Sequence, residues 1–340
     1  MLRIVRLAVL AAMAVALAGC IETKQDYTLN PDGSGKVVVE LILEQTPMNF
    51  GQTEAPPPDV IAKQTCRQIL DRSAGIDAWS DVTVGLTDDG RTRFCGTAYF
   101  KDLSKLQFQA AGAQGVSFVK DDKGGMVLTL AGKPPEKAGA APPPPPTEDQ
   151  VAQRIQAQRD KFQQMRPVME MAMAKMKTDF SFRLPGTLAE VSNLQKEPSG
   201  AVRIVVEGAK MLQVLDQLMA DDAYMRELVV SGGDVGQGGP KLNEMMNEKM
   251  LGSKAPIQAR VTGDLRPLFP YESEVKAAKD NYPKMIERLG LDQLPAPSPS
   301  PMPPGFRGAP GGGVPPGAVP SPAGPGAQRR GGAVEQGAGK

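Results

Sequence analysis

"KQDYTLNPDGSGKVVVELILE", residues 24–44, contains two strand-like runs on either side of a turn. The turn itself, NPDGSG at residues 30–35, is made of the residue types that favour a reversal of the chain. After the turn, Val37, Val39 and Leu41 alternate with other residues and therefore fall on one face of the run. This alternation is typical of a half-buried strand. The segment predicts an antiparallel hairpin near the amino terminus.

The same pattern recurs twice further along the chain. Residues 81–100 contain two strand-like runs joined by TDDG, and residues 115–130 contain two more joined by DDKG. Between the first and second hairpins, residues 59–72 have the spacing of an amphipathic helix. Repeated hairpins with interspersed helices predict an α+β fold in which helices pack on one face of an antiparallel, hairpin-built sheet. We assign residues 24–132 to this first α+β domain.

The rest of the chain divides into three segments. Residues 133–147 include five consecutive prolines, which favour a stiff linker. Residues 148–292 form a second α+β portion, which starts with a long helix capped by Thr147 and kinked or broken at Pro167. Residues 293–340 are rich in proline and glycine, have few large apolar residues and are predicted to be disordered.

The amino-terminal segment has the pattern of a secretory signal. Arg3 and Arg6 precede the uncharged apolar run of residues 7–17. This run is too short to span a bilayer, which needs about 20 apolar residues. A short apolar run behind two arginines is typical of a cleaved signal peptide. We therefore predict a signal peptide at residues 1–19.

The next residues carry a recognisable motif. Residues 17–20 read LAGC, which resembles the lipobox of bacterial lipoproteins. The resemblance implies cleavage before Cys20, a diacylglyceryl group on its thiol and a lipid anchor at residues 20–23. Two or three acyl chains on one residue would anchor the chain firmly in a membrane. The expected location is the bacterial cell envelope. Ile21 in the next position favours the outer membrane where the host has one.

Two further stretches are similar to segments of small bacterial envelope lipoproteins of the LppM type. They are YTLNPDGSGKVVVEL at residues 27–41 and RLPG at residues 183–186. This resemblance implies an α+β lipoprotein fold that binds lipid or envelope components. It assigns no specific residue.

The chain contains three cysteines. With Cys20 lipidated, Cys66 and Cys95 remain as a pair in an oxidising compartment. Cys66 lies on the predicted helix and Cys95 on a predicted strand. A disulfide between them would join helix to sheet, and we predict this bond. The alternative is two buried free thiols.

Composition bears on the kind of function. The chain has no histidine, so it lacks the usual general base of enzymes at neutral pH, and we expect no catalytic activity and no cofactor. Removing Arg3 and Arg6 with the signal leaves 37 basic against 38 acidic residues. Such a chain has no excess of positive charge for phosphates, so nucleic acid is not an expected partner.

One face of the long helix is rich in methionine. Its residues are Met165, Met169, Met173 and Met176. Thioethers suit Cu(I), so these residues are candidate metal ligands. A methionine stripe at helical spacing is more often part of a core, and we favour that interpretation.

Three functional hypotheses follow. The first is a membrane-anchored envelope lipoprotein that acts as a non-enzymatic binding or structural module, with an envelope protein or a lipid as partner. The second is a carrier of a lipid or small hydrophobic ligand. The third is a copper-handling protein that uses the methionine-rich helix. Trp79 and Tyr99 are candidate pocket residues, although packing in the core is their default role.

Overall fold

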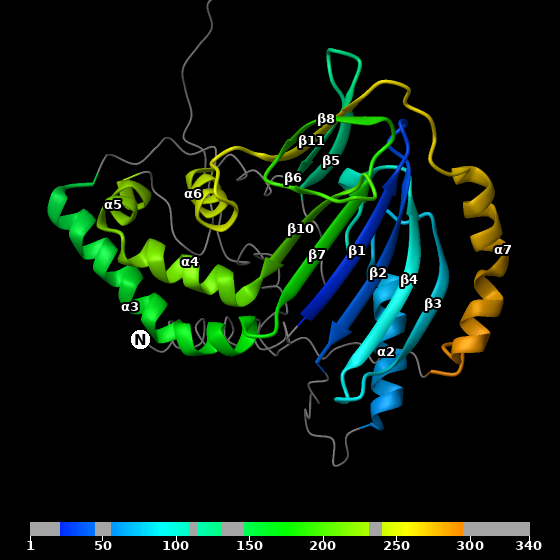
Figure 1. The fold of residues 1–340 in the computed structure, drawn as a ribbon. Helices are drawn as coiled ribbons and strands as arrows, with labels where there is room; N and C mark the ends of the chain where they lie inside the picture. Colours follow the sequence, from blue (N-terminus) through cyan, green and yellow to red (C-terminus); the bar gives the residue numbers. More distant parts are fainter. Residues whose placement is uncertain (1–20, 45–55, 109–114, 131–145, 231–239, 295–340) are drawn as a thin grey trace, which may run out of the picture. The chain divides into compact units, whose positions relative to one another are not determined.

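The computed structural model describes residues 21–44, 56–108, 115–130, 146–230 and 240–294 (Figure 1). Two sheets and several α-helices make up this part of the chain, which confirms the predicted α+β class. The predicted signal peptide at residues 1–19 and Cys20 lie outside the described residues. Most of the predicted linker at 133–147 and nearly all of the tail at 293–340 also lie outside them.

The first predicted hairpin is formed by β1 (Ile21–Leu29) and β2 (Gly35–Leu43). Tyr27 lies opposite Val37 in the antiparallel register. The backbone amide of Asn30 donates to the carbonyl of Ser34 at 2.8 Å, and Asp32 accepts from the Ser34 amide at 3.0 Å. These contacts close the predicted turn and set the alternation that directs one face of each strand into the core.

The hairpin lies at the centre of a seven-stranded sheet with the order β3-β4-β2-β1-β7-β10-β9. The other strands are β3 (Ala78–Leu86), β4 (Thr92–Phe100), β7 (Lys177–Arg183), β9 (Gln195–Lys196) and β10 (Val202–Glu207). All neighbours pair antiparallel except β1 and β7, which pair parallel with Tyr27 opposite Phe182. The central pair therefore joins the two α+β portions that the sequence predicts.

A second sheet has the order β5-β6-β11-β8. Its strands are β5 (Val116–Lys120), β6 (Met126–Leu130), β8 (Thr187–Ser192) and β11 (Ile257–Thr262). The pairing of β6 with β11 again joins the two predicted portions, so these portions share both sheets.

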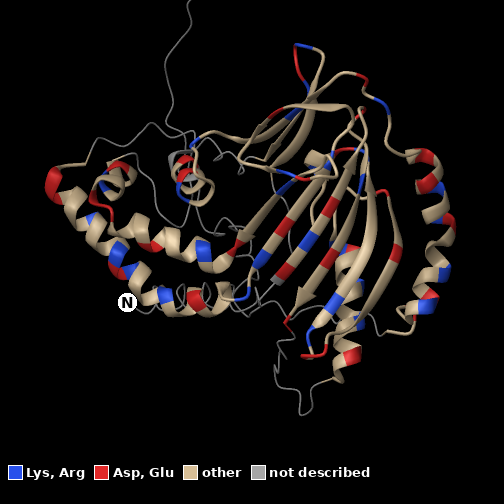
Figure 2. Ribbon diagram, viewed as in Figure 1, with Lys and Arg blue, Asp and Glu red and all other residues tan. Residues whose placement is uncertain are grey.

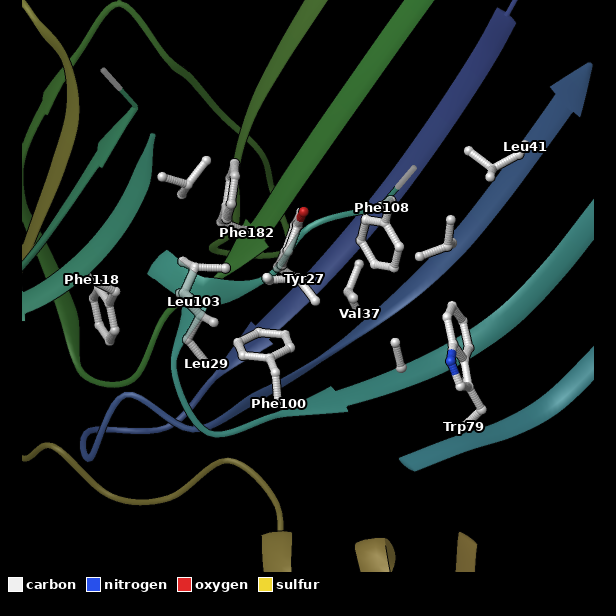
Figure 3. Packing of buried hydrophobic residues seen from close by; sticks show 14 of the residues in the cluster. Tyr27, Leu29, Val37, Leu41, Trp79, Phe100, Leu103, Phe108, Phe118 and Phe182 are labelled. Carbon is white, nitrogen blue, oxygen red and sulfur yellow. The ribbon is translucent and has the colours of Figure 1, made fainter. Parts of the chain in front are cut away.

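The two sheets and helix α2 (Pro58–Arg72) contribute to one large hydrophobic core (Figure 3). Tyr27 stacks on Phe182 near its centre, with ring centroids 4.8 Å apart. The short 3₁₀ helix η1 (Leu103–Lys105) covers the same core. Phe118 reaches this core from the second sheet, and Ile69 reaches it from α2.

The opposite face of the seven-stranded sheet is polar. Lys, Arg, Asp and Glu recur along its strands (Figure 2). Arg203 and Asp179 form a two-pronged ion pair with distances of 2.8 and 2.6 Å between their nitrogens and oxygens. The pKa of Arg203 is raised, first by this hydrogen bonding. The sheet is therefore half-buried, with one apolar and one charged face.

Four helices have a core of their own. They are α3 (Glu148–Met173), α4 (Gly208–Ala220), α5 (Asp222–Val230) and α6 (Pro240–Leu251). Phe162, Leu218 and Met225 are buried in this second core. The predicted cap at Thr147 is confirmed, because its hydroxyl accepts from the Gln150 amide and the Gln150 side chain accepts from the Thr147 amide. Pro167 lies inside α3 and does not break it.

Candidate functional site

The last helix, α7 (Tyr271–Leu289), runs beside the edge strand β3 (Figure 1). Its first half packs on the polar side of the sheet, where Val275 and Ala278 form a small core with Ala78, Tyr99, Phe269 and Tyr271. The Tyr271 hydroxyl donates to Asp77 at 2.6 Å. This half of the helix therefore covers the end of β3, an edge that would otherwise be open to pairing with another chain.

The second half of α7 reaches the other side of the sheet. Met285 belongs to the large core, and Ile286 and Leu289 pack against it. Arg288 donates to the backbone carbonyl of Val82 at 2.9 Å. The helix thus crosses the sheet edge from the polar side to the core side. Pro283 lies inside α7, which continues through it to Leu289.

The turn of the first hairpin helps to hold the start of α7. The buried Asn30 side chain donates to the carbonyl of Phe269 at 3.3 Å and accepts from the amide of Leu268 at 2.8 Å. Lys36 pairs with Glu274 at 2.7 Å and lies 4.5 Å from the ring centroid of Phe269. The sequence that forms the first hairpin therefore also positions the last helix.

A cleft of about 470 Å³ lies between β3 and α7. Its lining combines charged, polar and apolar side chains: Trp79, Ser80, Asp81, Tyr99, Glu274, Ala277, Ala278, Asn281, Lys284, Met285 and Arg288. This volume is within the range of small-molecule sites. A second hollow of about 310 Å³ is lined by residues of β3, α7 and α2, and Trp79 lines both.

The wall formed by β3 is irregular at Asp81. Asp81 and Val82 together stand opposite the single residue Gly96, which makes a β-bulge. The bulge returns Val82 to the core, where it is fully buried, and leaves Asp81 exposed at the cleft. Asp81 has a φ angle of 54°, in the left-handed region that residues other than glycine rarely adopt.

Polar groups converge at this end of the cleft. The Ser80 hydroxyl donates to the Asp81 carboxylate at 2.8 Å and lies 3.4 Å from the Tyr99 hydroxyl. Burial raises the pKa of Tyr99; the hydrogen bond with Ser80 lowers it, and the nearby Glu274 and Asp81 carboxylates raise it further. Both carboxylates therefore act on the Tyr99 hydroxyl.

The wall of the cleft formed by α7 carries charges of both signs. Glu274, Asn281, Lys284 and Arg288 line it at spacings of three, four or seven residues along α7. Such spacing places them on one helix face. At 1.5 Å per residue, Lys284 lies about 15 Å along the helix axis from Glu274. Glu274 thus lies towards the start of this wall and the cations towards its end, where Arg288 reaches the Val82 carbonyl next to Asp81.

The chemistry of the cleft follows from the side chains that line it. Ser80 lies beside a carboxylate, but no imidazole can relay its proton, because the chain lacks histidine. Within the described residues, no three His, Cys, Asp or Glu side chains are grouped so that they could hold a metal ion. What the cleft does offer is hydrogen-bond donors and acceptors together with apolar surface.

The predicted Cys66–Cys95 disulfide is corrected by the structure, in which both thiols are free. Cys66 lies in the large core, whereas Cys95 follows the buried Phe94 on β4 and faces the polar side opposite Glu40. The sheet therefore separates the two sulfurs. Burial raises the pKa of Cys66 to about 12 and also raises the pKa of Cys95.

The four methionines proposed as copper ligands do not share one environment. Met169 and Met173 pack against the second core. Met165 is 41 % exposed, and Met176 lies beyond the end of α3 in a partly buried position. Met169 and Met173 therefore have the role in core packing that we favoured for the methionine stripe.

Trp79 and Tyr99 are the cleft residues that the sequence identifies as candidates. Both are almost fully buried and also line the cleft, so they combine packing with a place in its wall. Sequence reasoning missed Asp81, Asn281 and Lys284. A signal for Asp81 was present, because the alternation of apolar residues that includes Trp79 slips by one residue before Val82.

The comparisons with known proteins identify no relative: no family model, curated protein or solved structure matches the chain. The resemblances to the lipobox and to LppM-type lipoproteins therefore stay predictions. Within the described residues, no helix combines the length and the apolar character needed to cross a membrane.

Proposed function

We propose that this chain is a lipid-anchored protein of the bacterial envelope whose folded body is a non-enzymatic binding module. In this proposal the lipid is attached at Cys20, and the ligand binds in the cleft between β3 and α7.

The main support for the proposal is that the LAGC motif directly precedes the first strand. The LAGC motif ends at Cys20, and β1 begins at the next residue, Ile21. With no spacer between lipid and strand, the anchor would hold this end of the central hairpin at the membrane surface.

The cleft supports the binding role. It is larger than the second hollow beside it, and its polar groups converge from two elements held together by buried contacts. Both hollows have charged groups in their walls, which favours a polar ligand over the lipid or hydrophobic cargo of the second hypothesis.

The anchor is tested by comparing Cys20→Ala with Cys95→Ala in cells. Wild type and Cys95→Ala should fractionate with membranes, and the mass of each should show the cut before residue 20 and the added lipid. Cys20→Ala should remain as an uncleaved precursor without lipid. Normal processing of Cys20→Ala would overturn the anchor assignment.

The binding role is tested by native mass spectrometry of the protein extracted from its own membranes. Extra mass that is lost in Asp81→Asn but kept in Lys276→Met would support a ligand in the cleft. Extra mass retained equally by both variants would assign the ligand to another site.

A further inference from the structure

One end of the seven-stranded sheet, where β1 begins, is defined by the register of its strands (Figure 1). Ile21, the first residue of β1, lies opposite Leu43 at the end of β2. Leu43 lies opposite Thr92 at the start of β4, and Thr92 lies opposite Leu86 at the end of β3. On the other side of β1, β7 begins at Lys177, beside the second residue of β1. We call this row of five residues the anchor end of the sheet.

The anchor end lies close to the predicted lipid site. Cys20 directly precedes Ile21, so their Cα atoms are about 4 Å apart. Neighbouring strands lie about 5 Å apart, which places Lys177 roughly 5 Å and Leu86 roughly 15 Å across the sheet from β1. Because β1 is paired with β2 and β7 from its first residues, no linker separates the lipid site from the sheet.

Two side chains at the anchor end suit contact with a lipid surface. Leu86 is 44 % exposed, although it lies on the same face of β3 as Val84, which packs against the large core. A single exposed leucine is ordinary on a protein surface, but this one lies where the anchor would bring lipid within reach. Lys177 is exposed on the other side of β1. Its long side chain can lie along apolar surface while its ammonium group stays at the headgroups.

Two cations near the anchor end are already paired with carboxylates. Arg91, in the turn between β3 and β4, pairs with Glu22 of β1 at 2.5 Å. Lys175, shortly before β7, pairs with Glu44 after β2 at 3.0 Å. Within the part of the chain that the structure describes, this end therefore has no cluster of free cations of the kind that selects anionic lipids. Contact with a bilayer should not require anionic headgroups.

We propose that the anchor end of the sheet is a membrane-contact surface, on which Leu86 and Lys177 lie at the lipid headgroups on either side of the anchored residue. This inference rests on the proposed lipid at Cys20. The partner is the bilayer that holds this lipid, because a chain fixed in the sheet from Ile21 cannot carry the anchor end away from it. The other end of β1, at Leu29, lies about 26 Å further along the strand.

Val119 provides a control position at the opposite end of the sheet. β4 runs from Thr92 at the anchor end to Phe100, which lies opposite Gly35 at the other end of β2. The short helix η1 and strand β5 follow β4 in the chain and contact each other. Val119 lies on β5 and is 57 % exposed, so it resembles Leu86 in type and exposure but not in place.

The test measures which positions lie at the lipid headgroups. The full chain carries Cys66→Ala and Cys95→Ala, together with one of Leu86→Cys, Lys177→Cys or Val119→Cys. Each protein is processed in cells, labelled at its single free thiol with a fluorophore and reconstituted into phosphatidylcholine vesicles. Lipids with a nitroxide in the headgroup should quench the labels at positions 86 and 177 severalfold more than the label at 119. Anionic lipid should leave this difference unchanged.

The mass of each protein separates the two proposals, because it shows whether Cys20 carries the lipid. A protein without lipid would overturn the anchor and this inference with it. A lipidated protein with equal quenching at the three positions would overturn only this inference. A label at position 86 that shifts to shorter wavelength without quenching would assign the surface to another copy of the chain, which also overturns it. Urea unfolding of each labelled protein confirms that it is folded.

Discussion

Asp81 and Asn193 are the two residues other than glycine with positive φ angles, 54° and 55°, in the described part of the chain. Of these two side chains, only that of Asn193 is hydrogen-bonded to another segment of the chain. Its amide donates to the backbone carbonyls of Ser253 at 3.1 Å and Ala255 at 2.6 Å. The Asp81 carboxylate holds no other segment in place. The fold therefore needs the backbone conformation at Asp81 but not its side chain.

Glycine at each position separates these roles. Asp81→Gly should change the free energy of unfolding by less than about 1 kcal/mol, because the relief of strain offsets the added freedom of the unfolded chain. Asn193→Gly should lower it by about 1–3 kcal/mol, since two carbonyls lose their donor. Urea unfolding measures both. A large loss in Asp81→Gly would mean that this carboxylate serves the fold after all.

Cys66 gives a second prediction at the scale of one residue. Burial holds its pKa at about 12 in the folded protein, above the ordinary value of 9.0 that applies in the unfolded chain. Unfolding between these pH values therefore releases a proton, and stability falls as the pH rises. Urea unfolding from pH 7 to 10.5 should show a decline that is shallower in Cys66→Ala than in wild type.

Other groups also contribute to this decline. Burial raises the pKa of Tyr27 as well, so some alkaline destabilisation should remain in Cys66→Ala. The comparison of the two slopes isolates the thiol, because every tyrosine is common to both proteins. Identical slopes would show that Cys66 is accessible enough to ionise in the folded state.

At the scale of elements, the junction between β10 and α4 depends on Gly208. A Cβ atom added there would lie 2.3 Å from the carbonyl oxygen of Met173 and 2.9 Å from the Cβ of Met176. The Gly208 amide also donates to the Met176 carbonyl at 2.8 Å. The end of α3 therefore meets the start of α4 at backbone distance, next to the sheet.

Gly208→Ala should lower the free energy of unfolding by about 1–3 kcal/mol, because the methyl group must displace backbone. Gly85→Ala is the matched control on β3, where an added Cβ has no heavy atom within 4 Å. That variant should be neutral or slightly more stable, since alanine restricts the unfolded chain. Equal changes in the free energy of unfolding of the two variants would show that the backbone at the α3–α4 contact can shift at little cost.

The elements that could be predicted from sequence are those specified by local chemistry. The NPDGSG turn reverses the chain through its own hydrogen bonds, and Thr147 caps α3 with a partner three residues away. Parallel pairing of β1 with β7 has no such local signal, because the rest of the first portion, the predicted linker and α3 separate the two strands in the sequence. For the same reason, the crossing of α7 over β3 could not be predicted.

The residues of the candidate site also divide into those that local sequence predicts and those that contacts distant in sequence decide. Trp79 and Tyr99 could be named from their type alone. The roles of Asn281 and Lys284 depend on which face of α7 lies over β3, and contacts distant in sequence decide this. The disulfide prediction failed for a related reason. Alternation along β4 puts Cys95 on the polar face, but the face covered by α2 is decided only when the sheet is assembled.

For the whole molecule, the shared sheets predict that neither portion folds alone. A fragment of residues 21–132 lacks β7 and β11, and a fragment of residues 146–294 lacks β1, β2 and β6. Each fragment would expose strands that the intact chain pairs. Urea unfolding followed by circular dichroism should show no cooperative transition for either fragment alone. Co-expressed fragments should form a complex, and its urea transition should match that of the full chain cut between residues 132 and 146. A cooperative transition in either fragment alone would contradict this prediction.

The place of β1 has a mechanical consequence. If the lipid is attached at Cys20 as we propose, any force between the membrane and the body would enter the fold at Ile21, at the start of β1. This strand is hydrogen-bonded on both sides, to β2 and to β7, so it cannot be peeled from an edge one bond at a time. Tension must instead shear both ladders together. The chain would therefore be pulled along the direction in which a sheet resists extension best.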